Sequence, residues 1–107
     1  MKETRLWRAI NASESELKGF LANVAVEYGL NYQEMADVIM CESGWRTDVF
    51  SAGNVSYGVA QFTRPTFDGY CQGFGEYEDP FAQLECMGFM FSKKMQGRWD
   101  CWRMLYE

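Results

Sequence analysis

DPFAQLECMGFMFSKKMQG, residues 79–97, has the pattern of a long helix that buries one face. Asp79 is a good N-cap because its carboxylate accepts backbone N–H bonds, and Pro80 suits the first helical position, where no N–H is needed. Apolar residues then recur every three or four positions, which is the spacing of a helix face, and Gly97 is the expected end. The residues on this face are Phe81, Leu84, Met87, Gly88, Phe91 and Met95.

Two further helices are predicted upstream, each from a capping pattern. Ser13 is followed by a glutamate three residues later, which is a capping box, and Gly29 suits the end of that helix. Asn31 begins the same pattern and predicts a second helix that runs to about Ser43. Their inner faces are expected to carry Leu17, Phe20, Leu21, Val24 and Tyr28 in the first, and Met35, Val38 and Ile39 in the second.

The remaining segments complete an all-α prediction for one domain, residues 1–107. Residues 1–12 form a weakly patterned arm, and residues 44–62 are punctuated by glycines, which indicates loops or short extended pieces. A short helix is expected over 63–70, and a last helical segment over 99–104, giving five or six helices with almost no strand. Candidate anchors of the arm are Leu6, Trp7 and Ile10.

The composition excludes several classes of function. The net charge is −5, with 10 basic against 15 acidic residues and no basic cluster, so a nucleic-acid partner is not expected. The chain has no histidine, which excludes Ser-His-Asp and Cys-His catalysis and every histidine-based metal site. No apolar run approaches the roughly 20 residues of a membrane-spanning helix, and no apolar signal core follows Met1.

The four cysteines, Cys41, Cys71, Cys86 and Cys101, are well separated. No pair has the C-x2-C spacing of a zinc knuckle, so we expect no metal and no other cofactor. In a chain this small, four cysteines indicate two disulfides, and the alternative is four buried free thiols in a cytosolic protein. Spacing alone does not choose among the three pairings.

Glu42 is a carboxylate on an apolar helix face. It continues the inner stripe of the second helix, residues 35–39, at the C-terminal end of that helix. Burial, the negative end of the helix dipole and the nearby Trp45 all disfavour its ionised form, so its pKa is expected to be raised, as a general acid requires. The alternative is a half-exposed helix-end glutamate, or one paired with Arg46 or Arg64.

Glu42 also belongs to an ordered set of short motifs. They are Cys41-Glu42-Ser43-Gly44-Trp45, Ser56-Tyr57-Gly58-Val59-Ala60-Gln61-Phe62, Pro65-Thr66-Phe67, Asp79-Pro80, Gln83 and Gln96-Gly97-Arg98-Trp99. This order resembles the lysozyme-like superfamily of peptidoglycan-cleaving enzymes. It is similar to lytic transglycosylases, and more so to the catalytic domain of resuscitation-promoting factors. The resemblance covers residues 33–102 and implies a small lysozyme-like helical domain with a substrate groove.

The resemblance assigns a role to each matching residue. Glu42 matches the catalytic acid, and Ser43 would help to orient it. Gln61 would hydrogen-bond the sugar near the cleaved bond, since an amide both donates and accepts. Thr66 and Gln83 would line the groove. On this basis Gln61→Ala is expected to reduce activity and to leave the melting temperature nearly unchanged. The alternative is that Gln61 bonds to the loop backbone across the Gly58 turn; the variant would then melt several degrees lower, and its loss of activity would follow its stability.

Four aromatic residues lie within the matching motifs. Tyr57, Phe62, Trp45 and Trp99 either stack on sugar faces or fill the core, and the core is the first expectation because large aromatics dominate buried area in small domains. Two features depart from the family pattern. The C-terminal spacing up to Cys101 is shorter than in the resuscitation factors, and the Ala-Tyr-Asn segment of many transglycosylases is absent.

The resemblance also implies a disulfide pairing and a place of action. In the family, the cysteine before the catalytic glutamate bonds to the C-terminal cysteine, which here pairs Cys41 with Cys101 and leaves Cys71 with Cys86. The expected partner is the glycan strand of peptidoglycan, cleaved by a monomer at the bacterial cell wall, outside the cell or in the periplasm. Because cell walls are anionic, the acidic charge suggests delivery by a larger assembly.

The sequence contains one convincing catalytic carboxylate, whereas glycosidases use two. One glutamate suffices in lytic transglycosylases, where the 6-hydroxyl of N-acetylmuramic acid attacks and a 1,6-anhydro sugar forms; attack by water would make the same site a lysozyme. Two other classes stay open: a non-catalytic glycan-binding module on the same fold, and a disulfide-stabilised interaction protein. Candidates for a second carboxylate are Asp48, Asp68, Glu76 and Asp79.

Overall fold

A computed structural model describes the backbone of residues 2–107 and the side chains of residues 6–107. About 66% of the chain is helical and 5% is strand, which confirms the all-α prediction. The α-helices are α1 (Lys2–Ile10), α2 (Glu14–Tyr28), α3 (Tyr32–Glu42), α4 (Arg64–Tyr70), α5 (Pro80–Ser92) and α6 (Asp100–Tyr106). Three short 3-10 helices, η1 (Ala52–Asn54), η2 (Gln72–Phe74) and η3 (Gln96–Arg98), and two strands, β1 (Ser56–Tyr57) and β2 (Phe62–Thr63), complete the described fold.

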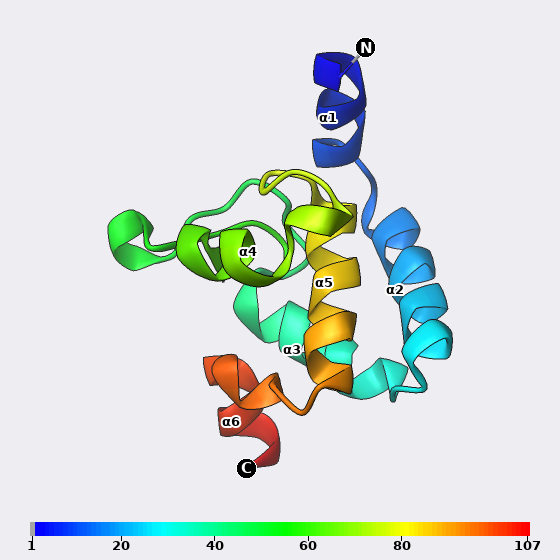
Figure 1. Cartoon of the computed structure of the whole chain (residues 1–107), viewed down its shortest axis with the longest axis vertical. Helices are drawn as coiled ribbons and strands as arrows, with labels where there is room; N and C mark the ends of the chain where they lie inside the picture. The colour runs from blue at the N-terminus through cyan, green and yellow to red at the C-terminus, as the bar shows by residue number, and fades with distance from the viewer. Residues whose placement is uncertain (1) are drawn as a thin grey trace.

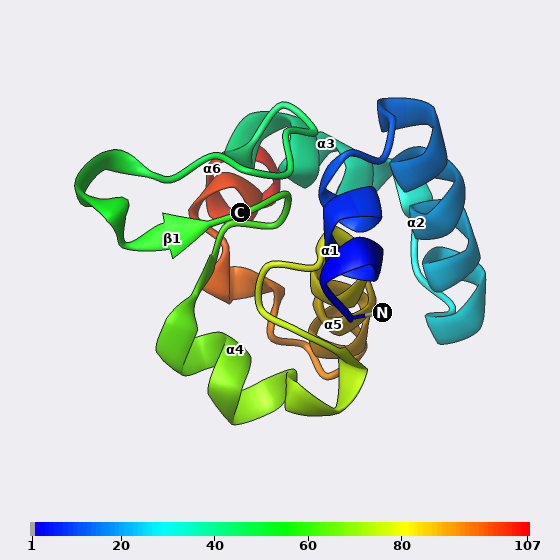
Figure 2. The same ribbon diagram turned by 90° about the horizontal axis from the view of Figure 1, so that it is seen from above.

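Helix α5 is the centre of the molecule, as Figures 1 and 2 show. Helix α2 packs along one side of it, and α3 passes beneath and contacts both α2 and α6. Most of the residues of α5 are buried, because the helix is surrounded on several sides. The apolar stripe predicted for residues 79–97 therefore marks the core.

The predicted helix starts are confirmed by their capping bonds. Ser13 and Glu16 form the reciprocal capping box of α2, and the Asn31 side chain accepts the backbone N–H of Glu34 in α3. The Asp79 carboxylate caps α5, which has proline in its first turn. Each cap satisfies backbone N–H groups that would otherwise lack a partner, so these starts depend only on residues within a few positions.

The end of α5 differs from the prediction. The helix ends at Ser92 rather than at Gly97, and Lys94 adopts the left-handed conformation with φ 64°. The backbone N–H of Met95 then bonds to the Met90 carbonyl, which closes the last turn. Lys94 thus has the left-handed conformation that was expected of a glycine at the helix end, and residues 96–98 form the separate η3.

The N-terminal arm is also more regular than predicted, because residues 2–10 form α1 (Figure 1). Trp7 is 66% exposed and does not anchor the arm, whereas Ala9 is buried. The Thr47 hydroxyl donates a hydrogen bond to the carbonyl of Ile10, so the end of α1 is tied to the loop after α3. Helix α1 also contacts α5.

The glycine-rich central region contains a two-stranded antiparallel hairpin formed by β1 and β2. Gly58, in the turn, has φ 90°, and a Cβ there would lie 2.5 Å from Nε2 of Gln83. Only glycine lets the Gln83 side chain approach the turn this closely. The hairpin is thereby fixed against α5 and forms one wall of the site described below.

Two disulfides are present, and both predicted pairings are confirmed. Cys41 is bonded to Cys101 and Cys71 to Cys86, at sequence separations of 60 and 15. These bonds indicate an oxidising environment, extracellular or periplasmic. No helix in residues 2–107 is both long and apolar enough to span a membrane.

Gly88→Ala is expected to destabilise the fold by crowding the contact between α2 and α5. A Cβ at Gly88 would lie 2.3 Å from Cγ1 of Val24. Overpacking costs about 1–3 kcal/mol, and the gain in helix propensity offsets about 1 kcal/mol of it. Thermal unfolding should therefore shift down by several degrees. Gly19→Ala is the matched control: nothing lies within 4 Å of its Cβ, so it should stabilise α2. Equal shifts for both variants would contradict the packing argument.

Candidate functional site

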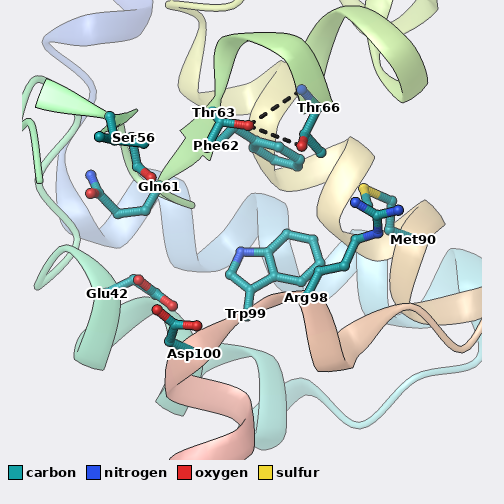
Figure 3. A pocket seen from close by; sticks show the side chains of 11 residues that line it. Glu42, Ser56, Gln61, Phe62, Thr63, Thr66, Met90, Arg98, Trp99 and Asp100 are labelled. Atoms are coloured by element: carbon teal, nitrogen blue, oxygen red, sulfur yellow. Dashed lines mark hydrogen bonds between the residues drawn. The ribbon is translucent and has the colours of Figure 1, made fainter.

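A groove with a volume of about 370 Å³ opens between the hairpin, α4 and the junction of α3 with α6. Figure 3 shows its lining from close by. Four of the predicted site residues lie in this groove, although they come from different elements of the chain. The lining residues are Glu42, Val55, Ser56, Gln61, Phe62, Thr63, Thr66, Met90, Arg98, Trp99 and Asp100.

Glu42 is the last residue of α3, and its side chain is half-buried at one side of the groove. The backbone N–H of Cys101 donates a hydrogen bond to Glu42 Oε2 at 3.2 Å. Cys41, the neighbour of Glu42, is bonded to the same Cys101. The disulfide and the hydrogen bond therefore hold the end of α3 and the start of α6 together around this carboxyl group.

Burial raises the pKa of Glu42 above its usual range. The N–H of Cys101 acts in the opposite direction, the negative charge of Asp100 raises the pKa further, and Arg103 lowers it. The ion pairs that the alternative for Glu42 requires are not found in residues 6–107: Arg64 pairs with Asp68 and Glu78, and Arg46 donates to the Ser43 carbonyl. A carboxyl group with a raised pKa in a groove is suited to donate a proton.

Asp100 is a second carboxylate in the groove, and sequence reasoning missed it. It is the first residue of α6 and it forms an ion pair with Arg103. Figure 3 shows the Glu42 and Asp100 carboxyl groups pointing toward one another. No local pattern singled out Asp100, since only the contact of α6 with α3 brings it to Glu42. The four sequence candidates, Asp48, Asp68, Glu76 and Asp79, are not among the lining residues.

Ser43 is buried and does not line the groove. Its hydroxyl donates to the Val59 carbonyl at 2.7 Å and accepts the backbone N–H of Trp45 at 3.2 Å. It therefore links the chain after Glu42 to the turn of the hairpin. This contact positions Glu42 through the backbone, without touching its carboxyl group.

Gln83 is fully buried, which corrects the prediction that it lines the groove. Its Oε1 accepts the backbone N–H of Ala60 at 3.0 Å, and its Nε2 donates to the carbonyls of Tyr57 and Tyr77. Both amide N–H groups and one lone pair of the amide oxygen are used inside the protein. Gln83 therefore fixes the hairpin turn to α5 and leaves no group for a sugar.

Gln61 does line the groove, but its amide nitrogen also serves the fold. Nε2 donates to the carbonyls of Val49 at 3.0 Å and Gly58 at 2.8 Å. These bonds are the ones that the alternative for Gln61 predicts, backbone contacts of the loop across the Gly58 turn. With each net hydrogen bond worth about 1 kcal/mol, we expect the variant to melt several degrees lower. An unchanged melting temperature would show that these bonds contribute nothing.

The four aromatics are all buried, which confirms the core as their first role. Trp99 donates its indole N–H to the Ala60 carbonyl at 2.8 Å, and its ring packs edge-on against Phe62. These two also contribute to the groove lining, whereas Tyr57 and Trp45 do not. Trp99 and Phe62 therefore add apolar ring atoms to the groove lining, although they are only 5% and 2% exposed.

The wall opposite the two carboxylates comes from the start of α4. The Thr63 hydroxyl caps α4 by accepting the backbone N–H of Thr66, and the two threonine hydroxyls are 2.9 Å apart (Figure 3). Thr66 lies in the groove as predicted. Its hydroxyl and that of Thr63 give this wall polar groups that a hydroxylated ligand can use.

Comparison with known proteins does not identify a relative. No family model, curated protein or solved structure matches this chain. In the described residues, no group of three or more cysteine, aspartate or glutamate side chains is placed to hold a metal ion.

Proposed function

We propose that this protein is a peptidoglycan-cleaving glycosidase of the lysozyme-like type. Its substrate would be the β-1,4 bond between N-acetylmuramic acid and N-acetylglucosamine, with Glu42 as general acid and base. The observation that carries the proposal is the Glu42 carboxyl group, half-buried in a groove, with a pKa raised by burial. The order of motifs around Glu42 and the polar side chains of Gln61, Thr63 and Thr66 in the groove support the same function.

Glu42 would act in two steps. As a carboxylic acid it donates its proton to the oxygen of the glycosidic bond, which breaks as positive charge develops on the muramic acid ring. As a carboxylate it then takes a proton from the attacking hydroxyl group. The hydrogen bond that the Cys101 N–H donates to Glu42 can form with both the carboxylic acid and the carboxylate, because it uses a lone pair of the oxygen. It therefore holds the group in place through both steps.

Asp100 offers a partner for a route through water. If water attacks, Asp100 can accept one of its protons, and the product has a free reducing end. If the 6-hydroxyl of muramic acid attacks, Glu42 suffices and the product is a 1,6-anhydro sugar. The chemical nature of the products separates the two routes, since only attack by water leaves a free reducing end.

A digestion experiment tests the proposal. Purified cell walls are incubated with the oxidised protein, turbidity is followed, and the soluble fragments are identified by mass spectrometry. We expect turbidity to fall and muropeptides to appear with reducing or 1,6-anhydro ends. A folded protein that binds the walls and releases nothing would be a glycan-binding module instead. A folded protein that neither binds nor cleaves would be an interaction protein without sugar chemistry.

Asp100→Asn is expected to move the pH dependence of cleavage to lower pH. Burial is the main cause of the raised pKa of Glu42, and the negative charge of Asp100 adds to it. Without that charge, and with Arg103 released from its ion pair, Glu42 loses its proton at a lower pH. The falling limb of activity, which follows deprotonation of Glu42, should shift with it. Asp68→Asn, outside the groove, should leave the limb in place; an identical profile for Asp100→Asn would contradict this coupling.

A further inference from the structure

Arg98 is a cation at the side of the groove away from the two carboxylates. It is the only basic residue among those that line the groove in the described part of the chain. Figure 3 shows the Trp99 ring between the Arg98 guanidinium on one side and the carboxyl groups of Glu42 and Asp100 on the other. A ligand lying over Trp99 would therefore meet positive charge at one end and the proposed acid at the other.

Tyr70 holds the Arg98 side chain in this position. Arg98 Nη2 donates a hydrogen bond to the Tyr70 hydroxyl at 3.2 Å, and the guanidinium carbon lies 5.1 Å from the centre of the Tyr70 ring. None of the ion pairs formed within residues 6–107 involves Arg98. Most of the five N–H donors of its planar fork are thus left for another group, and a carboxylate is the group that fits them.

The proposed substrate has such a carboxylate in one place. The sugar rings and N-acetyl groups of the glycan strand are uncharged, so these parts offer Arg98 no anionic partner. N-acetylmuramic acid carries a lactyl arm that ends in a carboxyl group. In peptide-free strands this group is a free carboxylate, and in complete peptidoglycan it is joined to a peptide with carboxylates of its own.

We propose that Arg98, positioned by Tyr70, binds a carboxylate on the lactyl arm of N-acetylmuramic acid or on the peptide attached to that arm. The inference rests on the proposed function and deepens it. In the proposed orientation, muramic acid lies at the Arg98 side of the groove and its C1 faces Glu42. Arg98 therefore sets both the direction of the strand in the groove and the choice of the sugar before the cleaved bond.

A binding experiment with three probes tests this site. Glu42→Gln protein, which cannot turn over substrate, is titrated by calorimetry. The first probe is the N-acetylglucosamine–N-acetylmuramic acid disaccharide with a free lactyl carboxylate, and the second is the same disaccharide with the peptide attached. The third is the neutral disaccharide of N-acetylglucosamine. We expect a carboxylate-bearing probe to bind roughly 3- to 10-fold more tightly than the neutral one, as for a partly exposed charge-assisted pair.

Variants of Arg98 then show whether this residue binds the carboxylate of the probe. Adding Arg98→Gln should remove the preference and leave binding of the neutral probe unchanged, while Arg98→Lys should keep part of it because the charge remains. Lys93→Gln is the control, since it removes one positive charge outside the groove lining and should keep the preference. If only the first probe binds more tightly than the neutral probe, Arg98 binds the lactyl carboxylate. If the second probe also does, Arg98 binds a carboxylate of the peptide.

Two results overturn the inference, and they differ from the result that overturns the proposed function. If all three probes bind equally, or if Arg98→Gln weakens all three by the same factor, Arg98 does not recognise a carboxylate, and the glycan site stands. If no probe binds to a correctly folded protein, the proposed function itself fails. Because the Arg98 side chain is exposed, its substitution should leave the melting temperature nearly unchanged, which confirms that the variant is folded.

Discussion

Glu42→Gln should slow peptidoglycan cleavage by roughly 10²- to 10⁴-fold, the usual effect of losing general acid catalysis. The upper end is expected because Glu42 serves as both acid and base. Glutamine keeps the shape of the side chain, and its Oε1 can still accept the N–H of Cys101, but it has no proton to give. Release of soluble muropeptides, measured as an initial rate, reads this effect directly.

The stability of Glu42→Gln should hold or rise. Burial disfavours the negative charge of the ionised Glu42 carboxylate, which is why folding raises the pKa of this group. Glutamine removes that charge. Glu34→Gln is the matched control, because it makes the same chemical change in α3 outside the groove, and its oxygen can still accept the indole N–H of Trp102. A Glu42→Gln protein that clears cell walls at the wild-type rate would refute the proposed function.

The pH dependence of the wild-type protein follows from the same group. Glu42 donates its proton in the first step, so activity should fall as the pH rises through its pKa. Because burial raises that pKa, the fall should begin at a higher pH than for an ordinary glutamate. Initial rates measured across the pH range check this, and activity that rises steadily through neutral pH would contradict it.

Removal of the Cys41–Cys101 disulfide should have the largest effect on stability. The bond closes a loop of 60 residues, and the chain-entropy relation gives it a stabilisation of up to about 4 kcal/mol. Cys41→Ala combined with Cys101→Ala should therefore lower the melting temperature strongly. Activity should fall even below that temperature, because the bond also joins α3 to α6 beside Glu42.

The other disulfide provides the contrast. Cys71–Cys86 closes a loop of 15 residues and is worth up to about 3 kcal/mol by the same relation. It joins the end of α4 to α5, and neither cysteine lines the groove. Its double alanine variant should lose stability while keeping most of its activity when folded. Equal loss of activity in the two double variants, each measured while folded, would show that the α3–α6 junction has no special role.

The helix starts and the buried faces could be predicted from the sequence because they depend on neighbouring residues. A cap at Ser13, Asn31 or Asp79 bonds to N–H groups two or three positions away, and the apolar stripes follow from the helical repeat. Glu42 could be singled out in the same way, because it is a carboxylate on the apolar face of a predicted helix. The end of α5 was missed because Lys94 adopts a left-handed conformation that usually selects glycine.

The sequence by itself determined the all-α class, the cysteine content and the helix-end carboxylate, since each is a property of composition or of residues within one helical turn. Only the tertiary structure decided what surrounds that carboxylate. Packing of α6 against α3 brings Asp100 to Glu42, and η3, which contacts α6, places Arg98 in the same groove. Packing of α5 against the hairpin makes Gln83 a buried support rather than a ligand contact. These contacts join segments distant in the chain, and local propensity carries no information about them.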